Sequence, residues 1–541
     1  MSLFDLEERL LLPEWSKSGD AVKTQEVKSL KNKKLSTLKD NTDFLYESFC
    51  INKTLGSAIE LLNIAYIENR DAEARIAARF IVQGFDLPPQ ILQFAKFILS
   101  GSNYNSGTDS ALNPTISVLR AWLKANPKDA LGWVDLARAY VSIGKITSAE
   151  NAITVATNLL PHHRWVVRVA SRFYVNNDQN DKAHYLLSKQ PTLKEDPWLL
   201  SAEIAVAESY KRPLKMVSQA KKIIESDIFS PSHLTELESS IATIELSNGA
   251  IKKAKKLYIS SLRIPNDNSL AQAKWAERNA NISNLVSSDL LFSKQGANEA
   301  KLWERYYSYD LPSAIKFGVE WFCNEPYTTQ PALIVTYLSS VLDDYQLCKE
   351  YANKGLNIDK FDTTLILNKI FADLCLLNDS CLENNSTDKW EITLKNFLSD
   401  DDDNIIAHAN ANLGLLYYRT GKYELGREYY TIACEYFLQK KNASGILASM
   451  NHYREAVIAN APWQDDVFFY MEQAYIDSPS KKEPALAYYY IKMNLLKSNP
   501  TKWDEIKSSF IDLSFLSSKD TKKGRVIDFD FNPDSPTIII K

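Results

Sequence analysis

Apolar and small residues recur with helical spacing between Ala130 and Pro161, and this stretch sets the pattern for much of the chain. Trp133, Leu136 and Tyr140 are three or four residues apart, so they share one face of a helix. Gly144 follows and tolerates the positive φ with which many helices end. The pattern predicts one helix before Gly144 and a second helix after it.

The second helix of this pair carries small residues where it must cross the first helix. Ala149 and Ala156 share a face, and their short side chains allow the two helix backbones to approach. Pro161 then ends the second helix, because proline cannot continue it. One helix pair cannot bury its own apolar face, so we expect further pairs to stack on this one.

The order of large, small and turn residues over 130–163 resembles a tetratricopeptide (TPR) repeat of about 34 residues. A second clear stretch covers 407–440, and weaker copies cover roughly 115–280 and 330–500. In the second clear stretch the matching residues are Leu413, Gly414, Tyr417, Gly421, Gly426, Tyr430 and Ala433. The resemblance implies an all-α fold, a TPR-like α-solenoid of stacked antiparallel helix pairs.

Changes in composition along the chain predict five parts. They are an N-terminal lead-in with a lysine-rich stretch (1–53), TPR-like helical repeats (54–377), an acidic and asparagine-rich linker (378–404), C-terminal TPR-like repeats (405–515) and an extended tail (516–541). Within the first repeat region, Gly101–Asn113 is rich in Ser, Asn and Gly, which predicts a loop.

The tail differs in character from the helical repeats. Val526–Phe531 alternates between apolar and polar residues and Ile538–Ile540 is β-branched, and both features favour extended structure. Such a tail can fold back on the last helices as a cap, or it can add a strand to a partner protein. The sequence favours neither role over the other.

Composition and charge exclude several classes of protein. The 541 residues include only 16 glycines, which fits helices joined by short turns better than an all-β fold. The net charge of −4 gives no overall preference for nucleic acid or for an anionic membrane. No stretch approaches the roughly 20 apolar residues of a membrane span, and the N-terminus lacks the basic start of a secretory signal. A cytoplasmic protein is therefore expected.

We find no motif that would support catalysis. The sequence contains no GxGxxG or GxxxxGK[ST] loop and no HExxH or GxSxG motif. His162 and His163 are adjacent, but neighbouring residues on a helix point about 100° apart, so no metal site is expected there. The run Asp400–Asp403 lacks the ligand spacing of a calcium loop and fits a linker or a helix N-cap. The six cysteines show no CxxC spacing, which predicts reduced thiols. The chain is thus expected to be non-catalytic, with no cofactor.

The TPR resemblance also implies where a ligand would bind. In that family the first helices of successive repeats line a groove that usually binds peptides. The groove positions correspond here to Arg138 in the first clear repeat and to Trp165, Arg168 and Arg172 in the next one. Arginine binds carboxylates through two hydrogen bonds and tryptophan is a frequent interface anchor. We therefore predict a basic groove for an acidic peptide segment at these four residues.

The corresponding face of the repeat at 407–440 carries His408, Asn412, Tyr418 and Arg419 and predicts a second binding region. Together these features favour a non-catalytic adaptor or scaffold that binds one or more proteins. The alternative is a nucleic-acid-binding or sensor subunit that uses the basic stretch at 28–39 and the arginine-lined groove. The two functions differ in salt response, because phosphate contacts release counterions and lose affinity steeply with salt. The sequence leaves the oligomeric state open.

Overall fold

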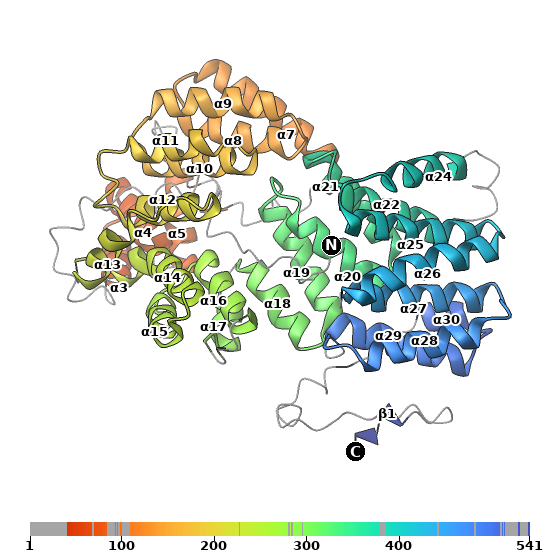
Figure 1. Ribbon diagram of the computed structural model, residues 1–541. Coiled ribbons are helices and arrows are strands. Elements are labelled where there is room, and N and C mark those ends of the chain that lie inside the picture. The colour runs from red at the N-terminus through yellow and green to blue at the C-terminus, as the bar shows by residue number, and fades with distance from the viewer. Residues whose placement is uncertain are drawn as a thin grey trace. The chain divides into compact units, whose positions relative to one another are not determined.

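Helices account for nearly all of the structure, as Figure 1 shows. The computed structural model describes residues 41–67, 70–83, 92, 95, 98–99, 109–226, 228–279, 282, 285–294, 296–377, 386–440, 443–480, 483–508, 511, 513, 529–530 and 539–540. The lysine-rich stretch at 28–39 lies outside the described residues, as does most of the predicted tail. Within the tail, β1 (Phe529–Asp530) pairs antiparallel with β2 (Ile539–Ile540), so these four residues are extended as predicted.

The chain divides into two compact units between Leu291 and Phe292. The helices of the N-terminal unit are α3 (Asn41–Ile51), α4 (Leu55–Ile67), α5 (Asp71–Val82), α7 (Asp109–Ala125), α8 (Ala130–Val141), α9 (Ile146–Leu159), α10 (Arg164–Asn176), α11 (Asn180–Ser188), α12 (Pro197–Ser209), α13 (Val217–Glu225), α14 (Pro231–Ser247), α15 (Ile251–Ser261) and α16 (Asp267–Asn279). The short helix α17 (Ser288–Ser293) spans the division.

The C-terminal unit continues with further helix pairs, and Figure 1 shows α22, α25, α26 and α27 stacked in that order. The helices of this unit are α18 (Asn298–Tyr307), α19 (Leu311–Asn324), α20 (Gln330–Val341), α21 (Tyr345–Ile358), α22 (Thr363–Cys375), α24 (Ser386–Phe397), α25 (Asp403–Arg419), α26 (Tyr423–Gln439), α27 (Ala443–Ile458), α28 (Gln464–Ile476), α29 (Pro484–Ser498) and α30 (Trp503–Ser508). Each unit is an array of adjacent, packed helix pairs, which confirms the predicted all-α solenoid.

A left-handed turn residue ends the first helix of most pairs and makes the repeat visible in the backbone. Residues with positive φ occur at 144, 178, 211 and 249 in the N-terminal unit and at 309, 343, 421 and 460 in the C-terminal unit. Where repeats follow directly, these turns are 33 to 39 residues apart. After each turn, the next backbone N–H donates to the carbonyl five residues earlier, at 2.8–2.9 Å. This is the Schellman arrangement, and its recurrence marks a TPR-like period.

Small residues sit at the helix crossings, as the repeat pattern predicts. Ala149 and Ala156 are fully buried in the pair formed by α8 and α9. In the pair formed by α25 and α26, a Cβ atom built on Gly414 would lie 2.6 Å from Cδ2 of Tyr430 and 3.1 Å from the carbonyl oxygen of Gly426. The two glycines therefore set how closely these helices approach.

We expect Gly414→Ala to lower the free energy of unfolding of the C-terminal unit by about 1–2 kcal/mol, because overpacking outweighs the better helix propensity of alanine. Gly56→Ala is the matched control, since no atom of the described residues lies within 4 Å of the added Cβ there. That control should be neutral or slightly stabilising. Urea unfolding followed by circular dichroism would measure both variants, and equal stability of the two would contradict the packing argument.

One stretch differs from its expected form. The predicted loop at 101–113 is wrong from Asp109 onward, because α7 begins there; Asp and Ser are as common at helix starts as in loops. Within 378–404, where the sequence predicts a linker around one short helix (390–398), residues 386–397 form α24, which packs against α25. Asp402 caps α25, because its side chain accepts a hydrogen bond from the backbone N–H of Asn404 at 2.8 Å.

Candidate functional site

Five first helices of the C-terminal unit form a closed circuit. In chain order these inner helices are α20, α22, α25, α27 and α29; each packs against the next, and α29 returns to pack against α20. The residues that join α29 to the start of the circuit are Lys492 and Asp343, whose Nζ and Oδ2 atoms are 2.8 Å apart. The circuit thus has an interior with two ends, one at the N-terminal side of these helices and one at the C-terminal side.

Buried charges fill the C-terminal end of the circuit. We call Asp343, Arg419, Arg454, Glu455 and Lys492 the charge cluster. The side chains of Asp343, Arg454 and Lys492 are 0% exposed. Arg454 Nε donates to Glu455 Oε1 at 2.8 Å, and Arg419 Nη2 donates to the same oxygen at 2.9 Å. Burial alone would raise the pKa of Glu455, but the two arginines outweigh it and the net pKa is lowered.

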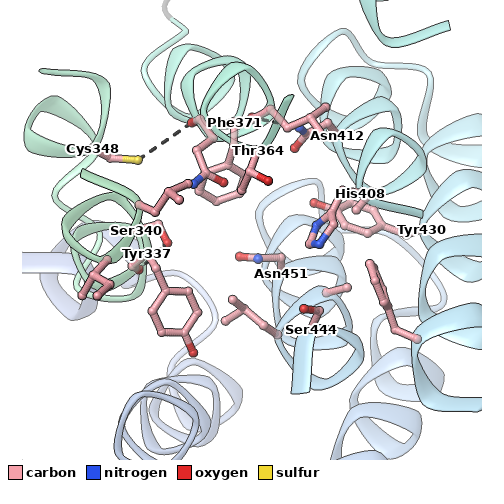
Figure 2. A pocket seen from close by; sticks show the side chains of 18 residues that line it. Tyr337, Ser340, Cys348, Thr364, Phe371, His408, Asn412, Tyr430, Ser444 and Asn451 are labelled. Carbon is pink, nitrogen blue, oxygen red and sulfur yellow. Dashed lines mark hydrogen bonds between the residues drawn. The ribbon is translucent and has the colours of Figure 1, made fainter. Parts of the chain in front are cut away.

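A pocket lies among the inner helices α20, α22, α25 and α27, and α21 and α26 also contribute to its lining. Its cavity volume is about 120 Å³. The described residues that line it are Leu333, Ile334, Tyr337, Ser340, Cys348, Thr364, Leu367, Asn368, Phe371, His408, Ala411, Asn412, Tyr430, Phe437, Ser444, Leu447, Ala448 and Asn451. Figure 2 shows Asn412, His408 and Asn451 around one open space. None of these lining residues is an acid, a lysine or an arginine.

Three of the polar residues in the pocket are asparagines on successive inner helices. Asn412 and Asn451 each precede by nine residues the left-handed turn residue of their own repeat, at 421 and 460, so they occupy the same repeat position. Asn368 is the corresponding residue of α22 and also lines the pocket. The asparagines hold neighbouring inner helices together: Asn412 Nδ2 donates to the Leu367 carbonyl at 3.0 Å, and Asn368 Nδ2 donates to Thr336 Oγ1 at 2.9 Å.

The one histidine of the pocket remains neutral. Burial lowers the pKa of His408 well below its ordinary value of 6.5. Its ring centroid lies 4.7 Å from that of Phe437. The described lining is therefore a mixture of apolar side chains and uncharged hydrogen-bonding groups at neutral pH.

The four residues predicted to bind an acidic peptide lie on α8 and α10, which are the first helices of two successive repeats in the N-terminal unit. Trp165 is 2% exposed, and Arg168 is buried in an ion pair with Glu236 of α14. Arg138 and Arg172 are half-buried. Peptide binding at these four residues stays a prediction, and the structure leaves Arg138 and Arg172 more accessible for it than Trp165 and Arg168.

The second predicted region is divided by the structure. His408 and Asn412 line the pocket. Arg419 belongs to the charge cluster, and the Tyr418 hydroxyl is 3.1 Å from His452 Nε2 and accepts a hydrogen bond from Trp463 Nε1. Asn368 and Asn451 were missed from the sequence, although their distance from the end of their helices is the same as that of Asn412.

Within the ranges that the structure describes, no group of three or more His, Cys, Asp or Glu residues could hold a metal ion. His163 caps α10, and His162 Nδ1 lies 3.3 Å from Gln190 Oε1. No helix of the described part is both long and apolar enough to cross a membrane. The five described cysteines are free thiols, namely Cys50, Cys323, Cys348, Cys375 and Cys434.

The fold and the pocket together define a class, a TPR-like helical solenoid with a cavity on its inner helices. Comparison with known proteins adds little to that description. The chain matches no family model, and no curated protein is similar to it in sequence. Among solved structures, it is similar to a chain of the structure of Naa15/Naa10 bound to HypK-THB, with 13% identity over 87% of this chain and 94% of that chain. The TM-score of this match is 0.19.

Proposed function

We propose that the protein is a non-catalytic adaptor that binds a segment of a partner protein in the pocket of its C-terminal unit. The observation that carries the proposal is the pocket itself, which four neighbouring inner helices line with apolar and uncharged polar groups. Pockets that combine apolar walls with a few directed polar groups are typical ligand sites. A protein segment fits this pocket better than a nucleic acid, because no described lining residue could neutralise phosphates.

The N-terminal unit offers a second, weaker candidate surface on α8 and α10. The Nε atoms of Arg168 and Arg172 are buried and have no hydrogen-bond partner among the described residues. Buried donors of this kind favour an acceptor such as a carboxylate. Binding of an acidic segment at this face remains the sequence-based proposal, and an adaptor with two binding faces would hold two partners.

Affinity capture from the source cell would test the adaptor proposal. Four full-length proteins are compared, namely the wild type and three variants. Ala411→Glu places a charge in the pocket, Arg172→Glu reverses the charge at the N-terminal face, and Ala121→Glu makes the same change as the first variant at an exposed site on α7. We expect Ala411→Glu to lose a protein partner that the wild type and Ala121→Glu both retain. Circular dichroism would first establish that all variants fold.

The outcomes separate the candidate functions. An identical set of partners for Ala411→Glu and Ala121→Glu would contradict the pocket as the binding site. Loss of a partner from Arg172→Glu alone would place binding at the N-terminal face instead. Capture of nucleic acid that declines steeply with salt would favour the alternative function over the adaptor.

A further inference from the structure

We infer that the pocket takes an extended, uncharged peptide segment and holds it through its main chain. This inference rests on the proposed function, and it specifies which chemical groups the pocket offers. The hydrogen-bond network around the three pocket asparagines fixes which half of each carboxamide faces the cavity.

Asn412 offers an acceptor. Its Nδ2 atom donates to the backbone carbonyl of Leu367, and a carbonyl can only accept, so the orientation of the carboxamide is determined. The Oδ1 atom has no partner among the described residues. It lies on the pocket side of the helix pair, where Figure 2 shows the Asn412 side chain.

Asn368 also offers an acceptor. The Thr336 hydroxyl donates its single proton to the carbonyl of Leu333 at 2.8 Å. The Thr336 oxygen must therefore accept the 2.9 Å hydrogen bond that joins it to Asn368, and Nδ2 of Asn368 is the donor. The Oδ1 atom of Asn368 has no partner in the described part of the chain, so it is a second acceptor available to a ligand.

Asn451 offers a donor, and the charge cluster fixes this polarity. Arginine can only donate, and Arg454 Nη1 donates to the Tyr489 hydroxyl at 2.8 Å. The hydroxyl proton is then directed to Asn451 Oδ1 at 3.0 Å. The Nδ2 group of Asn451, which bonds to no described residue, is left for a ligand. Arg454 and Tyr489 are thus positioning residues for this group.

The pocket therefore offers acceptor, acceptor and donor groups on three successive inner helices. An extended main chain carries the complementary N–H and C=O groups along its length. Packed helices are about 8–10 Å apart, and three residues of extended chain span about 10 Å, so successive asparagines would meet main-chain groups about three residues apart. Charged side chains are disfavoured at these positions, because the lining provides no counterion.

A backbone-substitution experiment tests the inference without altering the protein. Short random peptides are selected on the full-length protein, and binders that Ala411→Glu abolishes and Ala121→Glu leaves unchanged are kept. In the best binder, each backbone amide is replaced in turn by an ester, which removes one N–H. We expect two ester positions to weaken binding by about fivefold or more each, and the selected peptides to be uncharged at the central positions.

A protein variant supplies an independent measurement. Asn451→Asp keeps the acceptor for the Tyr489 hydroxyl but replaces the free donor with an acceptor. We expect this variant to bind the same peptide about tenfold more weakly. Asn151→Asp, at an exposed position of α9, is the matched control and should bind normally. Melting curves of both variants would establish that the fold is intact.

The two proposals fail in different ways. A selection that yields no binder sensitive to Ala411→Glu would overturn the pocket as a peptide site and hence the proposed function. Peptides that depend on Ala411 but tolerate every ester, or that share a charged residue at their centre, would overturn the main-chain inference alone.

Discussion

Asp343→Asn is expected to lower the free energy of unfolding of the C-terminal unit by about 3 kcal/mol. The variant keeps the shape of the side chain and tolerates the φ of 60° at this position, since asparagine adopts left-handed backbone more readily than most residues. It removes the carboxylate that lies 2.8 Å from Lys492 Nζ, so an ammonium group that is 0% exposed loses its counterion. The loss of charge, and not backbone strain, accounts for the effect.

Urea unfolding followed by tryptophan fluorescence would measure this change. Glu505→Ala is the control, because it breaks the exposed ion pair of Lys502 and Glu505, and such pairs contribute only about 0–1 kcal/mol. Asp343→Asn combined with Lys492→Met should recover much of the stability, since the unpaired charge is then gone. If Asp343→Asn lowered the free energy of unfolding no more than the control does, the charge cluster would not hold the circuit closed.

Glu483→Gln is expected to stabilise the protein by about 3 kcal/mol at pH 9 and to have little effect near pH 4. Glu483 caps α29 by accepting from the backbone N–H of Leu486 at 2.9 Å, which glutamine can also do through its amide oxygen. Burial raises the pKa of Glu483 from 4.5 to about 8, and its Oε1 atom has no hydrogen-bond partner in the part of the chain that the structure describes. The folded state therefore favours the protonated acid.

The sign of the pH dependence follows from this raised pKa. The contribution of Glu483 to the free energy of unfolding is fully present below pH 4.5, where the carboxyl is protonated in both the folded and unfolded states. This contribution is lost as the pH rises toward about 8. Glutamine does not titrate, so the variant avoids that loss. Thermal melts of the wild type and the variant at pH 4 and pH 9 would show a difference in melting temperature that grows with pH. A constant difference would mean that the pKa of Glu483 is the same in the folded and unfolded states.

Local pattern was sufficient to predict the helix pairs and their turns. Gly144 and Gly421 were identifiable because glycine is the residue that most readily adopts positive φ, whereas the equivalent positions Asp178, Lys211 and Tyr309 carry ordinary side chains in the same conformation. At those positions the packing of the whole repeat imposes the turn. The periodicity of the neighbouring apolar residues therefore locates the helices where no single turn residue does.

Contacts between distant residues were the part that the sequence could not provide. Arg168 was predicted to face a ligand, but in the structure it pairs with Glu236, which is 68 residues away. Asn412 was recognised as a groove residue because its repeat is the clearer one, while Asn368 and Asn451 belong to repeats whose pattern is too weak to assign positions. The pocket depends on all three, so its chemistry appears only once the inner helices are brought together.

The closed circuit of inner helices changes how the C-terminal unit should come apart. In an open repeat array each repeat contacts only its neighbours, so the terminal repeats fray first and the array unravels in stages. Here the ion pair of Lys492 and Asp343 ties the last inner helix to the first, so neither end of the circuit is free to fray. The C-terminal unit should therefore melt as one cooperative block, although its sequence is that of a modular repeat protein.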